Sequence, residues 1–226
     1  MKIFSTILIA LFLGLANLTH AQTDKQALID QVLSNTDKVE SLRLIQRVGG
    51  YNPDYQELNT LFKQMDRKVK KSTDGKIFAR YLKALKASSV GQKAPGITQF
   101  DTDGLPYSLS DLKGKYVLLD FWASWCSDCK KAHPELVEIY NDFKGPNFEI
   151  LGISLDKERA PWVKEIEEGN LDWKHISDLQ GWNSSASQIY AVKAVPQNIL
   201  VDPEGKIIAR NIYGAELSAL LKEVLY

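Results

Sequence analysis

The chain has 226 residues, 44% of them apolar, and equal numbers of basic and acidic residues, 28 of each. A net charge of zero argues against a general nucleic-acid binder, and the length suffices for one good core and a smaller appendage. The charges are unevenly distributed. Residues 22–90 carry 13 basic and 8 acidic side chains, a net +5, whereas residues 91–226 carry 14 and 20, a net −6. This asymmetry indicates two units, either docked electrostatically or simply presenting two solvated surfaces.

The N-terminus has the pattern of a secretory leader. Lys2 gives a short basic start, residues 3–16 are almost wholly apolar, and Thr19-His20-Ala21 offers small residues at the two positions that a signal peptidase reads. The apolar run is shorter than the roughly 20 residues of a membrane-spanning helix. We therefore expect a signal peptide over residues 1–21, cleaved near Ala21-Gln22, and a secreted or periplasmic mature chain. An uncleaved anchor is the alternative.

The pattern over residues 22–89 predicts a helical N-terminal region. Apolar side chains recur at helical spacing, and Gly49-Gly50 ends one of the runs. Asn52-Pro53 would begin the next helix with a capping side chain and a proline at the first helical position, and Thr73-Asp74 would cap the last. The apolar stripes predict core and carry no chemistry. Whether this region packs on the rest of the chain or binds a partner stays open.

The remaining part, residues 90–226, alternates strand and helix patterns. The expected strands cover residues 97–100, 107–109, 116–122, 148–155, 197–201 and 206–210. The expected helices cover residues 130–143, 160–168 and 215–225, and a short strand-helix unit covers 173–190. This order predicts an α/β sandwich with a mixed sheet.

The chain has only two cysteines, Cys126 and Cys129, and they lie where the strand over 116–122 gives way to a helix. A cysteine in the first turn of a helix meets unpaired N–H groups and the positive end of the helix dipole, which both favour its thiolate. Cys126 would attack a substrate disulfide, and Cys129 would resolve the mixed disulfide. The alternative, a structural disulfide, is a poor use of this spacing because so short a loop constrains the unfolded chain little.

A metal site is the second alternative for the cysteine pair. Zinc requires four ligands, and copper carriers add histidine or methionine. The part after the leader offers His133, His175 and Met65, and His133 lies about two turns further along the helix than Cys126. We expect no metal and no separate cofactor.

Two carboxyl groups lie near the cysteines in the sequence. Asp128 stands between them, where its charge would disfavour the thiolate and make the protein a reductant, unless the side chain points into solvent. Asp120 interrupts an apolar strand, so its pKa should be raised, which suits it to move protons to and from Cys129. The alternative for Asp120 is a strand-end aspartate bonded to backbone.

Val195-Pro196 precedes the expected strand over 197–201. X-Pro bonds are cis in only about 5–6% of cases, so the dipeptide alone decides nothing. Its backbone groups could pair with an extended substrate as an added strand does.

These motifs together resemble the thioredoxin fold, specifically the extracytoplasmic TlpA/ResA-like group of the AhpC/TSA-redoxin branch. Residues 117–126 (VLLDFWASWC) are close to the thioredoxin signature, Pro134 falls where that family kinks its active-site helix, and residues 108–115 resemble the redoxin lead-in. Residues 156–187 correspond to an extra element of this branch. The resemblance implies a three-layer sandwich over 90–226 with a mixed central sheet.

The resemblance also implies roles for single residues. Asp120 matches the buried proton-transfer carboxylate, Trp125 the tryptophan before the nucleophile, and Pro196 the cis-proline. Trp125 and Val195 would contact the substrate.

The chain departs from the family pattern at two places. The pair between the cysteines is Ser127-Asp128 where thioredoxins commonly have Gly-Pro, and Ala132 stands where ResA-like members often carry glutamate. The resemblance implies a role in cytochrome c biogenesis, and the second departure counts against that role. Peroxiredoxins share the lead-in but attack peroxide from a Pro-Thr-Cys setting that this sequence lacks.

The sequence thus predicts an extracytoplasmic thiol–disulfide oxidoreductase that reduces protein clients and receives electrons from a membrane thiol reductant. A thiol peroxidase-like redoxin is one alternative. The other is a binding or assembly module, in which the disulfide stabilises a recognition surface made by residues 156–187. Trp162, Trp173 and Trp182 in that stretch are expected to be core.

Overall fold

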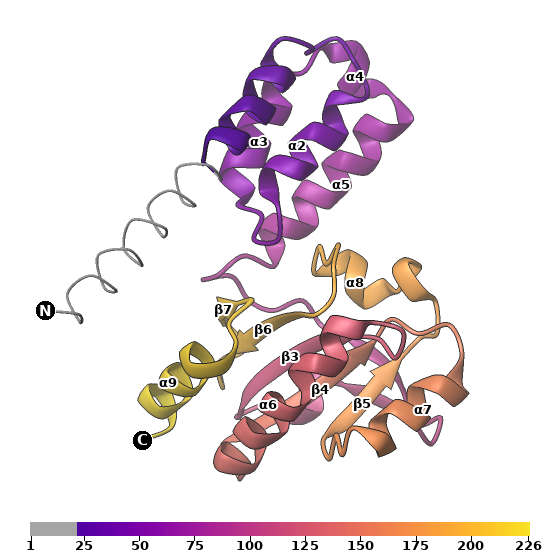
Figure 1. Cartoon of the computed structure of the whole chain (residues 1–226), viewed down its shortest axis with the longest axis vertical. Coiled ribbons are helices and arrows are strands. Elements are labelled where there is room, and N and C mark those ends of the chain that lie inside the picture. Colours follow the sequence, from indigo (N-terminus) through magenta and orange to yellow (C-terminus); the bar gives the residue numbers. More distant parts are fainter. Residues whose placement is uncertain (1–21) are drawn as a thin grey trace, which may run out of the picture. The chain divides into compact units, whose positions relative to one another are not determined.

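The computed structural model describes residues 22–226, and the predicted leader lies outside the described residues (Figure 1). The chain divides into a helical unit that ends at Leu82 and an α/β unit that runs from Lys83 to Tyr226. The expected division at residues 89 and 90 stays a prediction. Among the described residues, no helix is both long enough and apolar enough to span a bilayer.

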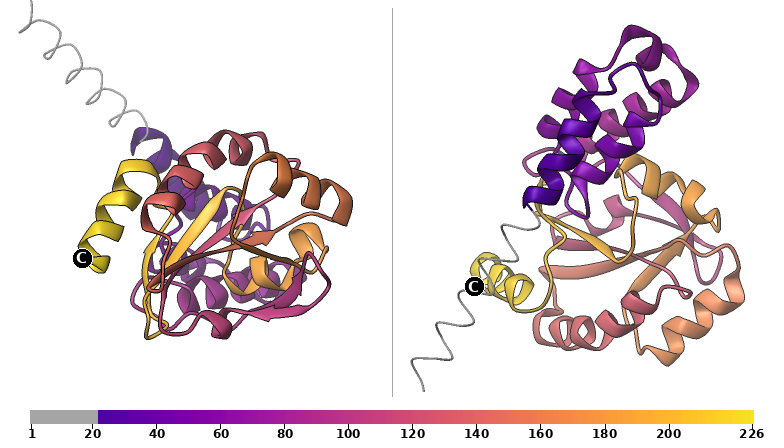
Figure 2. Two further views of the ribbon diagram at one scale, coloured as in Figure 1. Left: turned by 90° about the horizontal axis from the view of Figure 1, so that it is seen from below. Right: turned by 45° about the horizontal axis from the view of Figure 1, so that its top comes forward.

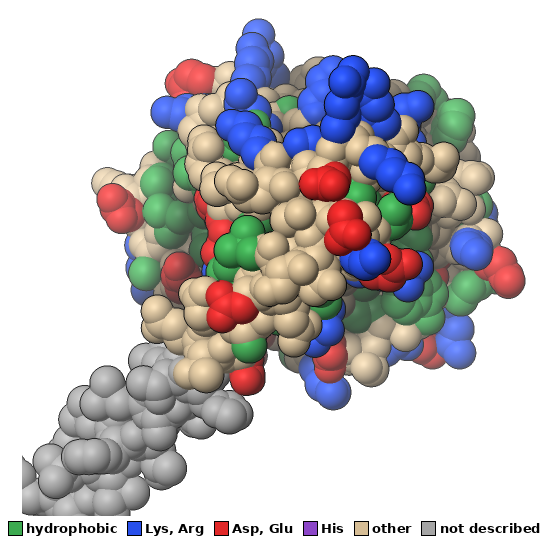
Figure 3. Space-filling view, turned by 90° about the horizontal axis from the view of Figure 1, so that it is seen from above, with side chains coloured by type: hydrophobic (Ala, Val, Ile, Leu, Met, Phe, Trp, Pro, Cys, Tyr) green, Lys and Arg blue, Asp and Glu red, His purple; other side chains and the backbone are tan. Residues whose placement is uncertain are grey.

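The helical unit is built as the apolar stripes predict. A helix over 22–33 is followed by α2 (Ser41–Gly49), α3 (Tyr55–Gln64), α4 (Arg67–Lys71) and α5 (Thr73–Ala87), of which α5 continues into the second unit. Most stripe residues turn inward, but Leu33 and Ile77 do not and are 48% and 49% exposed. The buried ones include Val32, Leu42, Ile45, Leu58, Met65, Val69 and Phe78. Figure 3, which looks onto this unit, shows Lys and Arg side chains gathered along one side of the visible face.

Two of the expected helix starts are wrong by one or two residues. The N-cap of α3 is Asp54, not Asn52, and its carboxylate accepts a hydrogen bond from the Glu57 amide at 2.7 Å. Asp54 is preferred because a carboxylate both caps the first turn and suits the positive end of the helix dipole. At α5 the Ser72 hydroxyl accepts from the Gly75 amide, so Thr73 and Asp74 already lie inside the helix.

The α/β unit is organised around one mixed sheet. Within residues 22–226 its strands follow the order β2 (Pro106–Ser108), β1 (Thr98–Asp101), β5 (Lys174–Ser177), β4 (Phe148–Ser154), β3 (Tyr116–Trp122), β6 (Gln197–Val201) and β7 (Ile207–Arg210). Strands β3, β4 and β5 are parallel, and the other pairs are antiparallel. The expected α/β fold with a mixed sheet is confirmed.

Helices cover both faces of the sheet, which gives the three layers. Helices α6 (Ser127–Phe143), α7 (Arg159–Glu168) and α9 (Gly214–Leu225) lie on one face, and α8 (Ser185–Ile189) lies on the other (Figure 2). Helix α6 begins at Ser127, three residues earlier than expected, because Cys126 forms its N-cap.

Strand β3 is central because its sequence, YVLLDFW, is almost continuously apolar, as strands buried on both faces are. All of its residues after Tyr116 are buried. The register with β4 and β6 sets Asp120 opposite Gly152 and Asn198. The carboxyl ends of β3 and β4 therefore meet at one edge of the sheet, next to the start of α6.

Candidate active site

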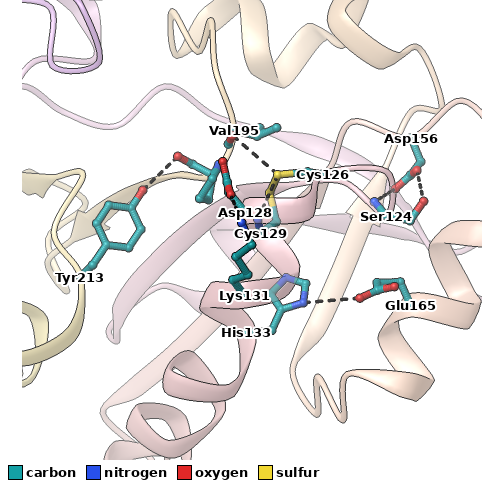
Figure 4. The surroundings of a disulfide bond; sticks show 11 residues. Ser124, Cys126, Asp128, Cys129, Lys131, His133, Asp156, Glu165, Val195 and Tyr213 are labelled. Atoms are coloured by element: carbon teal, nitrogen blue, oxygen red, sulfur yellow. Dashed lines mark hydrogen bonds and ion pairs between the residues drawn. A yellow bond between two sulfur atoms is a disulfide. The ribbon is translucent and has the colours of Figure 1, made fainter.

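The two cysteines form a disulfide at the N-terminus of α6, with their Cα atoms 5.3 Å apart (Figure 4). Cys126 is the N-cap, and its sulfur accepts a hydrogen bond from the Cys129 amide at 3.0 Å. Helix N-terminal amides stabilise negative charge, so this position favours a thiolate at Cys126 in the reduced state. The exposed fraction is 7% for Cys126 and 1% for Cys129, so Cys126 is the sulfur that a large substrate can reach.

The segment that leads into β6 contacts the disulfide. The Val195–Pro196 peptide bond is cis, and the Val195 carbonyl oxygen lies 3.6 Å from the Cys126 sulfur. The Tyr213 hydroxyl donates to the Pro196 carbonyl at 3.1 Å (Figure 4). The structure thus brings Val195 and Pro196 to the reacting sulfur. Sequence reasoning gave Tyr213 no role, since it lies beyond the hairpin that follows the proline.

Asp120 lies under the cysteine pair and is 4% exposed. Burial raises the pKa of its carboxyl group to about 7. Its Oδ2 has no hydrogen-bond partner among the residues that the structure describes. Asp120 and Cys129 line the same cavity, of about 20 Å³, which is room for about one water molecule. A carboxyl group with this pKa can exchange a proton with a thiol across such a gap.

Two of the further α6 side chains that line this cavity bear on its charge. Ala132 is one of them, so the position where related proteins often carry glutamate faces the same space as Asp120. Glu135, one turn later, is the other, and sequence reasoning missed it. Its carboxylate lies against Gly214, which has a φ of 52°, and a Cβ at Gly214 would lie only 2.6 Å from Glu135 Oε1. A glycine there lets the start of α9 approach α6.

The Asp128 side chain is turned toward Lys131 (Figure 4). Its carboxylate forms an ion pair with the Lys131 ammonium at 2.9 Å, and the two side chains are 73% and 76% exposed. The solvent and the neighbouring cation both weaken the effect of Asp128 on the thiolate. The position of Asp128 therefore corresponds to the solvent-facing alternative.

Trp125 is 54% exposed beside Cys126, and its ring centroid is 5.9 Å from that of Trp182. Trp162 and Trp173 are buried, as expected. The expectation for Trp182 is wrong, because it is 45% exposed. It lies in the short 3-10 helix η2 (Gly181–Asn183) and contacts the half-exposed Trp125.

A buried carboxylate holds the loop that leads into the active site. Asp156, which is 1% exposed, accepts hydrogen bonds from the Ser124 amide at 3.0 Å and from the Ser124 hydroxyl at 2.6 Å. The Ser154 hydroxyl is a third donor, at 2.7 Å. Sequence reasoning assigned Asp156 only to the start of the inserted element. The available signal was its place just after β4, the parallel neighbour of β3.

The two histidines of the α/β unit are buried against Trp122 rather than turned to the cysteines. His133 Nδ1 lies 3.8 Å from Glu165, which also pairs with Lys130 at 2.5 Å. Burial lowers the pKa of His133, although the Glu165 charge opposes this, and burial lowers the pKa of His175 to about 3. Within residues 22–226, no three His, Cys, Asp or Glu side chains come together as metal ligands would.

A mixed sheet of this topology, with a Cys-x-x-Cys pair where its central strand passes into a helix, defines a thiol–disulfide oxidoreductase of the thioredoxin fold. The chain belongs to the AhpC/TSA family, whose sequence profile matches residues 90–210, more than half of the chain.

Known relatives and solved structures carry the same activity in their names. Thiol-disulfide oxidoreductase ResA of Bacillus subtilis is 32% identical over 120 residues, which are 53% of this chain and 65% of that protein. ResA of Bacillus cereus is 28% identical over 66% of this chain and 84% of its own length.

Among solved structures, the thioredoxin domain of a thiol-disulfide oxidoreductase from Bacteroides vulgatus is 39% identical. The match has a TM-score of 0.58 and covers 61% of this chain and 99% of that one. A thiol-disulfide oxidoreductase from Bacteroides fragilis is 38% identical, with a TM-score of 0.57 and coverage of 59% and 99%.

Proposed function

We propose that this chain exchanges disulfides with protein clients through Cys126 and Cys129, and that it works as a reductant outside the cytoplasm. The observation that carries the exchange chemistry is the difference between the two sulfurs. Cys126 caps α6 and accepts the Cys129 amide hydrogen bond, while Cys129 is buried beneath it beside the cavity of Asp120.

The steps follow from these positions. The Cys126 thiolate attacks one sulfur of a client disulfide, and the other client sulfur leaves as a thiolate. The Cys129 thiol then gives its proton to the Asp120 carboxylate and attacks the Cys126 sulfur. This releases the second client thiolate and leaves the Cys126–Cys129 disulfide, which is the state of the structure.

The client would lie across Val195 and Trp125. The Val195 carbonyl, 3.6 Å from the Cys126 sulfur, is placed to pair with an extended client backbone. Trp125, the residue directly before Cys126, offers an exposed ring.

The extracytoplasmic location rests on the pattern of the first 21 residues. A protein exported by that leader is beyond the reach of cytoplasmic reductases, so its dithiol would be regenerated by a membrane thiol reductant. N-terminal sequencing of the protein from the periplasmic fraction should find Gln22 as the first residue. An intact Met1 start would contradict cleavage.

The activity is tested by insulin reduction. The wild-type protein should precipitate insulin chains in the presence of a dithiol, whereas Cys126→Ser should be inactive. Pre-reduced Cys129→Ser, mixed with insulin after the dithiol has been removed, should accumulate client-linked mixed disulfides. A binding module would show no turnover that depends on the cysteines. Trapping with Cys129→Ser in cells then identifies the clients.

A further inference from the structure

A groove beside the reacting sulfur has no role in the exchange chemistry described above. Its volume is about 430 Å³. We call it the tryptophan groove, and the residues that line it include Trp125, Leu155, Lys157, Pro161, Gly181 and Trp182. Trp125 comes from the loop before α6, and Trp182 comes from η2, which lies 57 positions later in the sequence. The fold therefore brings two exposed indoles together at the active-site edge of the sheet.

The groove is held by ordered backbone on both sides. Behind Trp125, the Ser124 amide and hydroxyl are bound by the buried Asp156 (Figure 4). Before Trp182, Gly181 has a φ of 56°, and a Cβ there would lie 2.9 Å from Cε of Lys157. The glycine thus allows the apolar stem of Lys157 to pack against the backbone of η2.

The composition of the groove favours an apolar occupant. Two indoles that are each about half exposed, with the exposed Pro161 beside them, present apolar surface that water solvates poorly. The charged side chains of the lining are Lys157, Glu158 and Asp156. Asp156 is buried and binds Ser124 and Ser154, so the charges that remain for a ligand, those of Lys157 and Glu158, are opposite. Indoles of this kind recur at recognition surfaces because they bury much area with few rotatable bonds.

The location of the groove identifies the occupant as the client chain. Trp125 is the residue directly before Cys126, so the groove begins where the client sulfur must arrive. An extended chain advances roughly 3.3 Å per residue, which places the side chains within one or two residues of the client cysteine over the groove.

We propose that the tryptophan groove is a specificity site that takes a large apolar or aromatic side chain next to the reacting cysteine of a client polypeptide. This proposal rests on the proposed function, and it narrows the substrates from protein disulfides in general to those with a large apolar residue beside the cysteine. Trp182 acts by contacting that side chain, while the exchange itself remains with the cysteines.

The test compares two symmetrical peptide disulfides, one with Phe and one with Gly on both sides of its single cysteine. The pre-reduced protein supplies both electrons in a single turnover: one protein dithiol and one peptide disulfide give one protein disulfide and two peptide thiols. Released thiols are quantified by chromatography, and each rate is divided by the rate of the same peptide with dithiothreitol.

The wild-type protein should prefer the Phe peptide by about fivefold to tenfold, the range that aromatic contacts support. Trp182→Ala should lower this ratio to below about twofold, and Trp182→Phe should retain most of it. Phe100→Ala is the matched control, because Phe100 is 59% exposed outside the groove, and it should leave the ratio unchanged. All four proteins should reduce glutathione disulfide at the same rate, which shows that they are folded.

The proposal is overturned if the wild-type protein shows no preference, or if Trp182→Ala keeps it. It is also overturned if Trp182→Ala converts a dimer into a monomer in sedimentation, since the groove would then bind a second copy of the chain. Failure of the wild-type protein to reduce insulin would instead overturn the proposed function itself.

Discussion

The Asp156 carboxylate binds Ser124 twice, through the amide at 3.0 Å and through the hydroxyl at 2.6 Å. The Leu155 amide also donates to the Trp122 carbonyl at 2.8 Å. These bonds join the carboxyl ends of β3 and β4 just before the nucleophile. Cys126 is therefore positioned by a neighbouring strand as well as by its own helix.

Replacing Asp156 by alanine should destabilise the oxidised protein by about 2 to 4 kcal/mol, because the buried Ser154 hydroxyl and two part-buried donors of Ser124 lose a charged acceptor. The same change should loosen the Cys126 loop and alter the rate at which iodoacetamide alkylates the reduced protein. Urea unfolding and alkylation kinetics measure the two effects.

The chain contains a matched control for this change. Asp178 also binds the amide and the hydroxyl of one serine, Ser185, at 2.8 and 3.1 Å, but on the protein surface. Asp178→Ala should cost less than about 1 kcal/mol and leave alkylation unchanged. Equal effects of the two variants would show that Asp156 does not position the active-site loop.

Asp120→Asn should make the protein more stable at pH 8 and slower in exchange. Burial raises the carboxyl pKa from 3.8 to about 7, so the folded state favours the protonated form. The stability this provides is fully present below pH 3.8 and is lost as the pH rises through 7. The wild-type protein should therefore lose up to about 4 kcal/mol relative to Asp120→Asn between pH 4 and pH 8. Urea unfolding at both pH values measures this difference.

Asp101 provides the opposite case. It is 5% exposed, and burial raises its pKa, but hydrogen bonds from the Leu105 and Asp103 amides and from Lys174 outweigh this and leave the pKa lowered. Asp101→Asn should therefore destabilise the protein at pH 8, with the difference shrinking as the pH falls below 3.8. A proton-transfer role for Asp120 further requires that only Asp120→Asn abolish a rate inflection near pH 7.

The comparison of sequence and structure shows where local patterns suffice. Strand β3 and strand β6 match their expected bounds. The sequence of β3 is almost continuously apolar, as expected for a strand covered on both faces, and β6 begins directly after Pro196. The positions of Cys126, Asp120 and Pro196 also follow from the motif. Each of these residues is fixed by its own strand or helix end.

Contacts made across the sheet escaped prediction. Asp156 and Ser124 are 32 positions apart. No local sequence pattern predicts that an aspartate after a strand will bind a loop on the neighbouring strand. Trp182 was assigned to the core because tryptophan usually is, but a three-residue 3-10 helix has no periodicity from which to read its buried face. The contact between the Glu135 carboxylate and Gly214 could not be predicted either, because it depends on how α9 packs on α6.

Asp128 and Lys131 should shift the redox potential in opposite directions. Asp128→Asn removes a negative charge near Cys126, which stabilises the thiolate and raises the potential. Lys131→Met removes the cation that offsets Asp128, which lowers it. Because both side chains are largely exposed, each shift should be on the order of 10 mV. Equilibration with glutathione buffers measures both, and shifts of the same sign would contradict this account.

Gly152→Ala should destabilise the protein although alanine is the better residue for an ordinary strand. Glycine loses more backbone entropy on folding than alanine, which by itself would stabilise the alanine variant by about 0.5 to 1 kcal/mol. A Cβ at Gly152, however, would lie 2.1 Å from Nδ1 of His175, on the paired strand β5. That ring cannot move away, because it packs against Trp122 and Trp173 at 5.4 and 5.6 Å. Overpacking of this kind costs about 3 kcal/mol, so the steric effect outweighs the entropy.

The control for this change is Gly96→Ala, since a Cβ at Gly96 meets no atom within 4 Å. Urea unfolding should place Gly96→Ala within about 0.5 kcal/mol of the wild-type protein. The double variant Gly152→Ala/His175→Ala should be more stable than the sum of its single variants predicts, because removing the ring makes room for the new methyl group. Strict additivity would mean that the clash lies elsewhere on β4.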